Sequence, residues 1–281
     1  MKTNNAMQLK ARINARAKKA NISPQLMMQD YMLERLLERI SRSPWRDKVI
    51  VKGGMLIALL IGVDNRVTKD LDTTLQGFAL THESAESVFC DIISIDIDDD
   101  IEFEFVRTED IREEDEYPGI KVFLKANYPP MSVPLSIDVT TGDAITPGPV
   151  AYNYQLLFDD YSIPLFTYPL ATCMAEKLET VISRGRANTR PRDYYDIYAL
   201  WMTRRDELEL LDLKNALIAT STKRGSSEAI DNYRQAMDAV SNDEMMLRRW
   251  DTYAKDYSYV GSLTLPSACE TVCEILVSIG W

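Results

Sequence analysis

The sequence predicts an α+β fold in which a strand-rich N-terminal part is followed by a helical C-terminal part. Strand patterns dominate residues 100–141, helical patterns dominate residues 170–281, and two helical segments precede the first strand. A stretch rich in proline and tyrosine, residues 147–169, indicates a linker between the two parts. We therefore expect two domains, at residues 1–165 and 166–281.

The first 75 residues alternate helices with short strands. Residues 6–19 have helical composition, and Ser23-Pro24 predicts the cap and first residue of a second helix, which ends at Ser43-Pro44. The apolar residues of this second helix follow amphipathic spacing: Leu33, Leu36, Leu37 and Ile40. Further along, the patterns predict a strand at KVIV (48–51), a turn at Gly53-Gly54, a helix at MLIALLIG (55–62) and a strand at TKDLDTTL (68–75).

The middle of the chain predicts one helix and three strands. Residues 82–94 favour a helix with Phe89, Ile92 and Ile93 facing inward. The strands are expected at IEFEFV (101–106), which carries Glu102 and Glu104 on one face, at IKVFLKANY (120–128), and at VPLSIDVTTGD (133–143). An acidic turn, EDIREEDEYPG (109–119), joins the first two. Two C-terminal helices are predicted from Leu170, Met174, Leu178 and Val181, and from Tyr194 to Trp201.

Composition and charge narrow the class of protein. The 281 residues carry a net charge of −11, which argues against a general nucleic-acid binder. Residues 1–52, however, hold 12 basic and 4 acidic residues, whereas residues 70–118 hold 2 basic and 17 acidic ones. This asymmetry suits a protein that grips a polyanion at one place and cations at another; a solvated helix face and an acidic loop would give the same counts. The acidic stretch 95–116 could equally dock a basic partner.

No secretory signal or membrane-spanning run is evident, because the longest apolar run, MLIALLIGV, is too short to cross a bilayer. The four cysteines lack zinc-ligand spacing, and His82 is the only histidine. We expect reduced, mostly buried thiols in a cytoplasmic protein without membrane partners. A Ser-His or Cys-His catalytic pair is disfavoured, and the P-loop pattern is absent.

Three acidic positions predict a metal platform. Asp70 and Asp72 stand one residue apart on a predicted strand, so both carboxylates reach the same face, and Mg²⁺ prefers such oxygen ligands. Asp138 lies inside an apolar strand, where it could complete a three-carboxylate site. Gly53-Gly54 would let backbone N–H groups face a phosphate. The alternative for Asp70 and Asp72 is the polar face of an edge strand.

Basic residues of the C-terminal part predict a triphosphate site. Lys177 and Arg184 share a helix face, and a following loop adds Arg186, Arg190 and Arg192. Asp193 and Asp196 open the next helix. Their simpler explanation is that acids in a first turn favour the helix dipole.

Taken together, these motifs resemble the AbiEii/AbiGii abortive-infection toxins, nucleotidyltransferases of the DNA-polymerase-beta-like superfamily. The resemblance rests on KGG-M-L followed by RVTKDLD, on IDVTTGDAITP, and on EKL…R…RPRDYYDIYAL, and it spans roughly the N-terminal two-thirds. It implies a central mixed β-sheet, Mg²⁺ and a nucleoside triphosphate. Many nucleotidyltransferases have serine after the glycine, whereas Met55 follows Gly54 here.

The resemblance also implies roles for individual residues. Asp70 and Asp72 would be metal ligands, with Asp138 as the further carboxylate, and Lys177 and Asp193 would complete the catalytic set from the helical domain. The triphosphate would contact a larger group: Lys52, Gly53, Gly54, Arg66, Thr68, Lys177, Arg184, Arg190, Arg192 and Asp196.

We accordingly expect an Mg²⁺-dependent nucleotidyltransferase toxin of a toxin–antitoxin or abortive-infection system acting in antiviral defence, with tRNA as the acceptor and a cognate antitoxin that opposes it directly or indirectly. Two alternatives stay open: transfer of a nucleotide or phosphate onto a protein, including the chain itself, and a non-catalytic nucleotide-binding interaction module.

Overall fold

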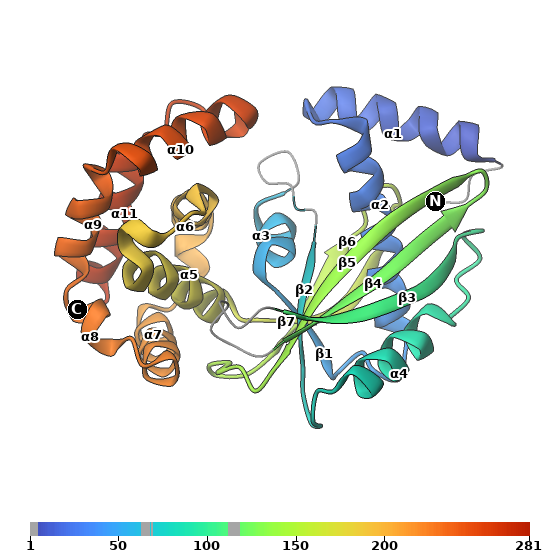
Figure 1. The fold of residues 1–281 in the computed structure, drawn as a ribbon, viewed down its shortest axis with the longest axis horizontal. Coiled ribbons are helices and arrows are strands. Elements are labelled where there is room, and N and C mark those ends of the chain that lie inside the picture. Colours follow the sequence, from blue (N-terminus) through green and yellow to red (C-terminus); the bar gives the residue numbers. More distant parts are fainter. Residues whose placement is uncertain (1–4, 63–67, 69, 112–118) are drawn as a thin grey trace. The chain divides into compact units, whose positions relative to one another are not determined.

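The computed structural model describes residues 5–62, 68, 70–111 and 119–281, and it divides into two compact units (Figure 1). Unit 1 comprises Met1–Leu59, Arg66–Asp143 and Pro149–Thr167. Unit 2 comprises Leu60–Asn65, Ala144–Gly148 and Tyr168–Trp281. Each unit is described by itself.

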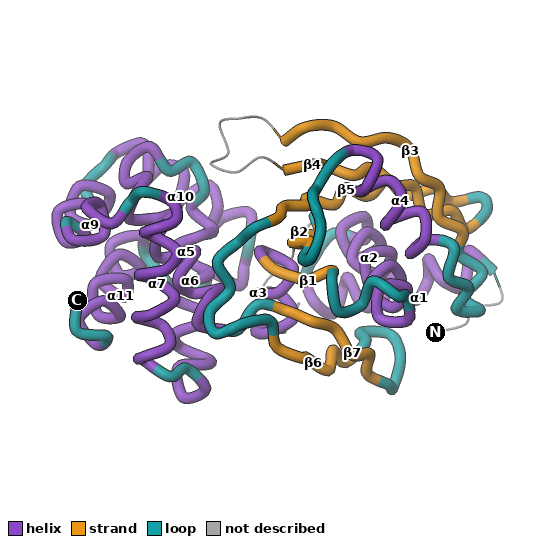
Figure 2. Tube along the Cα trace, turned by 90° about the horizontal axis from the view of Figure 1, so that it is seen from below, coloured by secondary structure: helices purple, strands orange, loops and turns teal. Residues whose placement is uncertain are grey.

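Unit 1 is built on a mixed sheet, as the resemblance implied. Its described strands are β1 (Val49–Lys52), β2 (Leu71–Leu75), β3 (Glu102–Ile111), β4 (Gly119–Tyr128), β5 (Met131–Thr141), β6 (Val150–Gln155) and β7 (Ser162–Thr167), in the order β3-β4-β5-β2-β1-β7-β6. β2 runs parallel to β5, and β1 parallel to β7, whereas the other neighbours are antiparallel. The long ribbon of β3, β4 and β5 and the shorter pair of β6 and β7 are seen in Figure 2. The α+β prediction is confirmed.

Three helices of unit 1 follow the sequence closely. α1 (Ala6–Ala20) begins after Asn5. α2 (Pro24–Arg42) begins after the Ser23 cap and is followed by Ser43 as its C-cap. α4 (His82–Ile93) begins with a capping box formed by Thr81 and Ser84. α2 packs against β5, β7 and α4, and α4 packs against β3 and β4. The core therefore lies between these helices and one face of the sheet, where Leu71, Ile137 and Val139 are fully buried.

The predicted linker at 147–169 is wrong, because its residues form the β6–β7 pair of the sheet. Within β7 the side chains of Ile163, Leu165 and Thr167 are buried in strict alternation. Pro164 lacks a backbone N–H, and it is tolerated because β7 pairs with β1 only through Phe166 and Thr167. Proline and tyrosine here belong to a strand rather than to a flexible connection.

Two element boundaries also differ from the prediction. Gly53-Gly54 is not a separate turn, since α3 (Gly53–Ile61) begins at Gly53, whose φ is +60°. β2 begins at Leu71, so Asp70 lies just before the strand rather than within it. Both differences concern residues of the predicted active site: Gly53, Gly54 and Asp70.

Unit 2 is helical in its described residues. It contains α5 (Leu170–Arg184), α6 (Pro191–Arg204), α7 (Leu210–Arg224), α8 (Ser227–Asp231), α9 (Tyr233–Ser241), α10 (Glu244–Asp256) and α11 (Leu265–Ser278). Hydrogen bonds join these helices to the two earlier segments of unit 2. Arg204 Nε donates to the carbonyl oxygen of Leu60 at 3.0 Å. Thr172 Oγ1 accepts from Thr146 N and donates to Thr146 O, both at 3.0 Å.

All four cysteines are free thiols, with Cys173 and Cys269 buried and Cys90 exposed. None of the described helices has the length and apolar character needed to cross a membrane.

Candidate active site

Gly53 and Asp72 occupy one tightly packed point of unit 1. The Gly54 N–H donates to Asp72 Oδ2 at 3.0 Å. A Cβ atom at Gly53 would lie 2.5 Å from Asp72 Cγ and would overlap its carboxylate oxygen. With φ at +60°, this position also disfavours any residue with a side chain. The glycine pair therefore lets the backbone at the start of α3 close onto the aspartate.

Asp70 is fixed by a different donor. Ser136 Oγ on β5 donates to Asp70 Oδ1 at 2.6 Å. Thr68, which is buried, uses its hydroxyl to bond the Asp70 carbonyl oxygen at 3.2 Å, so it shapes the backbone before β2. In the part of the chain that the structure describes, neither Asp70 Oδ2 nor Asp72 Oδ1 has a hydrogen-bond partner.

Asp138 lies beside Asp72 but faces another partner. The two aspartates are register partners on the parallel strands β2 and β5, and on the other side of β5 Lys121 of β4 is the register partner of Asp138. Lys121 Nζ lies 2.6 Å from Asp138 Oδ1. Asp138, which was predicted to bind a metal ion, is therefore already paired with the ammonium group of Lys121.

The pKa values of this pair follow from burial and neighbouring charge. Burial raises the pKa of the Asp138 carboxyl; Lys121 opposes the rise, and Asp72 and Asp70 add to it. Burial alone would lower the pKa of Lys121, but the attraction of Asp138, with that of Asp70 and Asp72, raises it. Asp70, Asp72 and Asp138 therefore interact electrostatically with one lysine.

Asp70 and Asp72 fit a divalent cation better than Asp138 does. Each is oriented through one oxygen by a neutral donor, which is the support that metal-ligating carboxylates commonly have. Among the described residues, no group of three or more acidic, cysteine or histidine side chains is arranged to hold a metal ion. The donor set is thus two carboxylates, a number that suits Mg²⁺ bound together with substrate phosphates.

Lys52, expected to contact the nucleotide, is held within the sheet. Its ammonium lies 2.5 Å from Asp143 Oδ2 and 2.7 Å from Thr140 Oγ1, at the end of β5. Its register partner on β2 is Asp72. The expected contact of Lys52 with phosphate stays a prediction.

The basic and acidic residues expected from the C-terminal part lie in unit 2. Lys177 of α5 contacts Asp193 Oδ1 and lies 3.2 Å from Asp196 Oδ2, with both aspartates on the first turns of α6. Asp193 and Asp196 are buried, whereas 17% of the Lys177 side chain is exposed. Arg184 is half-buried, and Arg186, Arg190 and Arg192 are exposed. Arg66 lies outside the described residues.

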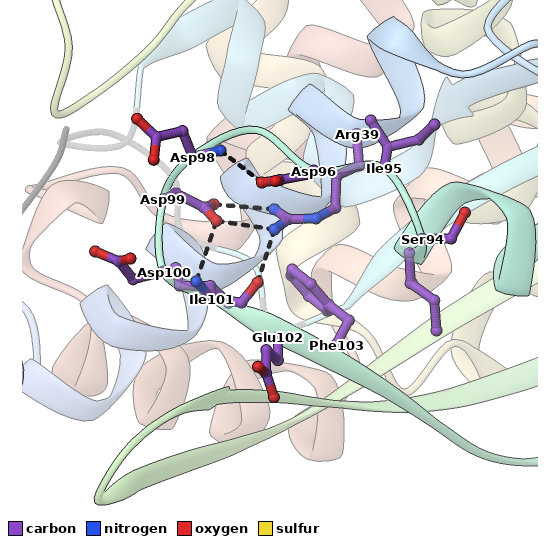
Figure 3. Close-up of a pocket in the computed structure, with 11 residues that line it drawn as sticks. Arg39, Ser94, Ile95, Asp96, Asp98, Asp99, Asp100, Ile101, Glu102 and Phe103 are labelled. Atoms are coloured by element: carbon purple, nitrogen blue, oxygen red, sulfur yellow. Dashed lines mark hydrogen bonds and ion pairs between the residues drawn. The ribbon is translucent and has the colours of Figure 1, made fainter.

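The acidic stretch lines a pocket of its own in unit 1, of about 590 Å³ (Figure 3). Arg39 forms a two-point ion pair with Asp99 at 2.8 and 2.9 Å and donates to the Ile101 carbonyl at 2.7 Å. The carboxylates of Asp98 and Asp100 point away from this pair. Part of the acidic stretch is therefore structural, since it anchors the loop before β3 to α2.

Comparison with known proteins identifies the family. The model of the family described as nucleotidyl transferase AbiEii toxin, type IV toxin–antitoxin system, matches residues 35–275. The chain belongs to the AbiEii nucleotidyltransferase toxin family. AbiEii membership makes it a transferase, so the non-catalytic alternative is disfavoured, and it places the protein among the toxins of type IV toxin–antitoxin systems.

Two solved structures share the fold of this chain. A candidate nucleotidyltransferase from Helicobacter pylori aligns with a TM-score of 0.52 and 13% identity, covering 92% of this chain and 96% of that one. JHP933 from Helicobacter pylori aligns with a TM-score of 0.51 and 13% identity, covering 92% of each chain. A search of curated proteins finds no significant match.

Lys121 is the residue that the sequence reasoning missed. A signal for it existed, because β4 and β5 form a hairpin around Pro129-Pro130, and counting back from that turn pairs Lys121 with Asp138. In this AbiEii chain the lysine also alternates with buried Ile120 and Val122, which assigns it to the same face as the acids.

Proposed function

We propose that this AbiEii toxin transfers a nucleotide from a nucleoside triphosphate to a tRNA in an Mg²⁺-dependent reaction. The observation that carries the proposal is the pair of oriented carboxylates, Asp70 and Asp72, held by Ser136 and by the Gly54 N–H at the start of α3. A single such pair is common in proteins. Its combination with the family match makes it the best candidate for the reacting centre.

The chain's own residues divide the work of this reaction. Asp70 and Asp72 would hold Mg²⁺, which when bound neutralises the triphosphate and favours an ionised attacking hydroxyl. Gly53 leaves space for the close approach of backbone and carboxylate. Lys177, aligned by Asp193 and Asp196, would neutralise phosphate charge. The acceptor hydroxyl oxygen would bond to the α-phosphorus while its proton passes to water. The bond between the α-phosphorus and the oxygen that bridges to the β-phosphorus would break, and pyrophosphate would leave.

Label transfer tests the proposal directly. Protein, Mg²⁺ and total tRNA are incubated with each of the four α-labelled nucleoside triphosphates, beside an Asp70→Ala/Asp72→Ala control. Label on tRNA with one nucleotide, absent from the control, is the expected result and names the donor. Label on protein alone would support the protein acceptor instead. No label on any acceptor, with the protein folded, would contradict the proposed transfer.

The antitoxin is proposed from family membership alone. Because type IV systems pair a toxin with an antitoxin, we expect co-expression of the cognate antitoxin to restore growth that the toxin arrests. Restored growth with unchanged label transfer in the purified mixture would indicate indirect neutralisation, whereas blocked transfer would indicate a direct one.

A further inference from the structure

Four charged residues cross the sheet of unit 1 in one register row. Lys121 on β4 pairs with Asp138 on β5, Asp138 pairs with Asp72 on β2, and Asp72 pairs with Lys52 on β1. Side chains at paired positions share a face of a sheet. This charge row therefore places two carboxylates side by side, flanked by one ammonium group at each end.

The two aspartates of the charge row have different partners. Asp72 accepts a neutral backbone N–H, which orients the carboxylate without cancelling its charge. Asp138 instead faces Lys121 at 2.6 Å, and both side chains are about two-thirds buried, at 31% and 28% exposed. An ion pair so placed is less screened than a surface pair, and separating it leaves charges without compensation.

The reach of Lys121 extends beyond Asp138. The attraction of Asp70 and Asp72 acts on the same ammonium group, so one cation sits within electrostatic range of all three carboxylates. A metal ion bridging Asp138 to the other two would share that carboxylate with an ammonium group, which weakens the attraction of Asp138 for a second cation. The described residues also contain no group of three metal-ligating side chains arranged around one point.

We propose that Lys121 is a built-in cation that removes Asp138 from the metal-ligand set, leaving one Mg²⁺ on Asp70 and Asp72 and supplying the second positive charge of the site itself. This inference rests on the proposed function for its metal and nucleotide. It makes Lys121 a positioning residue for Asp138 and a specific feature of this chain's centre.

Metal stoichiometry tests the proposal without measuring turnover. Mn²⁺, used in place of Mg²⁺, is titrated by electron paramagnetic resonance in the presence of a triphosphate analogue that cannot be cleaved between the α- and β-phosphates. We expect the complex of the wild-type protein with the triphosphate analogue to bind one Mn²⁺ ion. Asp72→Asn should weaken that binding at least about tenfold, which corresponds to 1.4 kcal/mol.

The most informative variant replaces both Lys121 and Asp138. Lys121→Met/Asp138→Asn keeps the net charge, so Mn²⁺ affinity should stay within about threefold of wild type, whereas loss comparable to Asp72→Asn would overturn the proposal. Lys121→Met alone should expose Asp138 and give a second or tighter Mn²⁺ site. If Lys121→Met gives the same Mn²⁺ titration as the wild type, the proposal is overturned as well. Lys121→Arg should keep the wild-type stoichiometry, because it keeps the positive charge.

A metal-free measurement separates this inference from the proposed function. In urea unfolding, the two single variants and the double variant form a cycle, and the pair should shift the unfolding constant non-additively by at least about threefold. Additive effects would overturn the inference even if Mn²⁺ binds as expected. Absence of Mn²⁺ binding in the wild type, with the coupling present, would contradict the proposed metal chemistry and with it the role of Lys121 as the site's second charge.

Discussion

Gly53 shows how a single residue can be constrained twice, by its backbone and by its neighbour. Its φ of +60° and its contact with Asp72 both exclude a side chain. Two other glycines separate these constraints: Gly77 has a φ of +92° with no atom close to its missing Cβ, and Gly148 has open space without a positive φ. These positions supply matched controls.

Gly53→Ala should therefore lose more stability than either control. Gly148→Ala is expected to be near neutral, and Gly77→Ala to cost about 1–2 kcal/mol through its backbone conformation. Gly53→Ala adds displacement of the Asp72 carboxylate, so it should lose label transfer as well as stability in urea unfolding. Equal stability losses at Gly53 and Gly77, with label transfer retained, would show that the contact with Asp72 does not matter.

Asp30 is a buried acid that the proposed reaction does not use. Burial, reinforced by Glu34 and opposed by Arg16, raises the pKa of Asp30 to about 7, and its Oδ2 has no hydrogen-bond partner among the described residues. Because the folded state holds this proton more tightly than the unfolded state, stability is greatest at low pH for this group. It falls as pH rises from the unfolded value near 4 through about 7.

Asp30→Asn should remove that pH dependence. The variant is expected to be more stable than wild type at pH 8, by up to about 4 kcal/mol if the full shift acts, and this advantage should be roughly 2–3 kcal/mol smaller at pH 5, where only part of the shift has acted. Urea unfolding at the two pH values measures this, with Asp251→Asn, an exposed acid, as the control. A variant less stable than wild type at pH 8 would contradict the prediction.

Among the elements, the helices of unit 1 were readable because caps and apolar spacing act locally, as at Ser23 for α2 and Thr81 for α4. The β6–β7 pair was not predicted, because the prolines of this segment favour loops, and the strand pairing that includes Pro164 cannot be seen in the local sequence. The charge row needs the register of four strands at once, and only the β4–β5 part of it is set by a local turn. For the same reason the sequence predicted Asp70, Asp72 and Asp138 as candidate ligands without indicating the lysine that pairs with Asp138.

Helix α1 is the element best suited to the acceptor. It contains no acid, buries Leu9, Ile13 and Ala17, and carries five basic residues, of which Arg16 lies 5.5 Å from the ring centroid of Phe158. The other four are exposed: Lys10, Arg12, Lys18 and Lys19. One face of the helix thus packs on unit 1, and the remainder presents positive charge to solvent.

Changing the four exposed residues to glutamine should weaken tRNA binding and flatten its salt dependence. Removing one ionic interaction with a phosphate lowers the slope of log affinity against log salt by about 0.7–0.9. The control changes the same number of exposed cations in unit 2: Arg205, Lys223, Arg248 and Lys255. An unchanged salt slope in the α1 variant would sink the assignment.

At the scale of the molecule, the two units are interleaved along the chain. Unit 2 takes residues 60–65 and 144–148, which interrupt unit 1 along the chain, as well as the C-terminal helices. Arg204 and Thr172 bond to these excursions at Leu60 and Thr146. Unit 2 therefore includes Leu60, which lies more than a hundred residues before the first of the C-terminal helices.

A fragment of residues 166–281 should accordingly unfold at lower urea concentration than unit 2 within the full chain. Hydrogen exchange at α5 and α6 reports the difference by region. Arg204→Met and Thr172→Val in the full chain each remove the hydrogen bonds to one of the two segments, and each bond contributes about 0.5–3 kcal/mol. Full-length protection of α5 and α6 in the fragment would contradict the expectation.

Interleaving also limits how such a protein can change by recombination. A crossover near residue 166 would join the C-terminal helices of one relative to the Leu60 and Thr146 segments of another, so each chimera would inherit mismatched halves of the same unit. Exchange of residues 166–281 alone between relatives is therefore disfavoured. We expect the helical unit to vary by substitution, in step with residues 60–65 and 144–148.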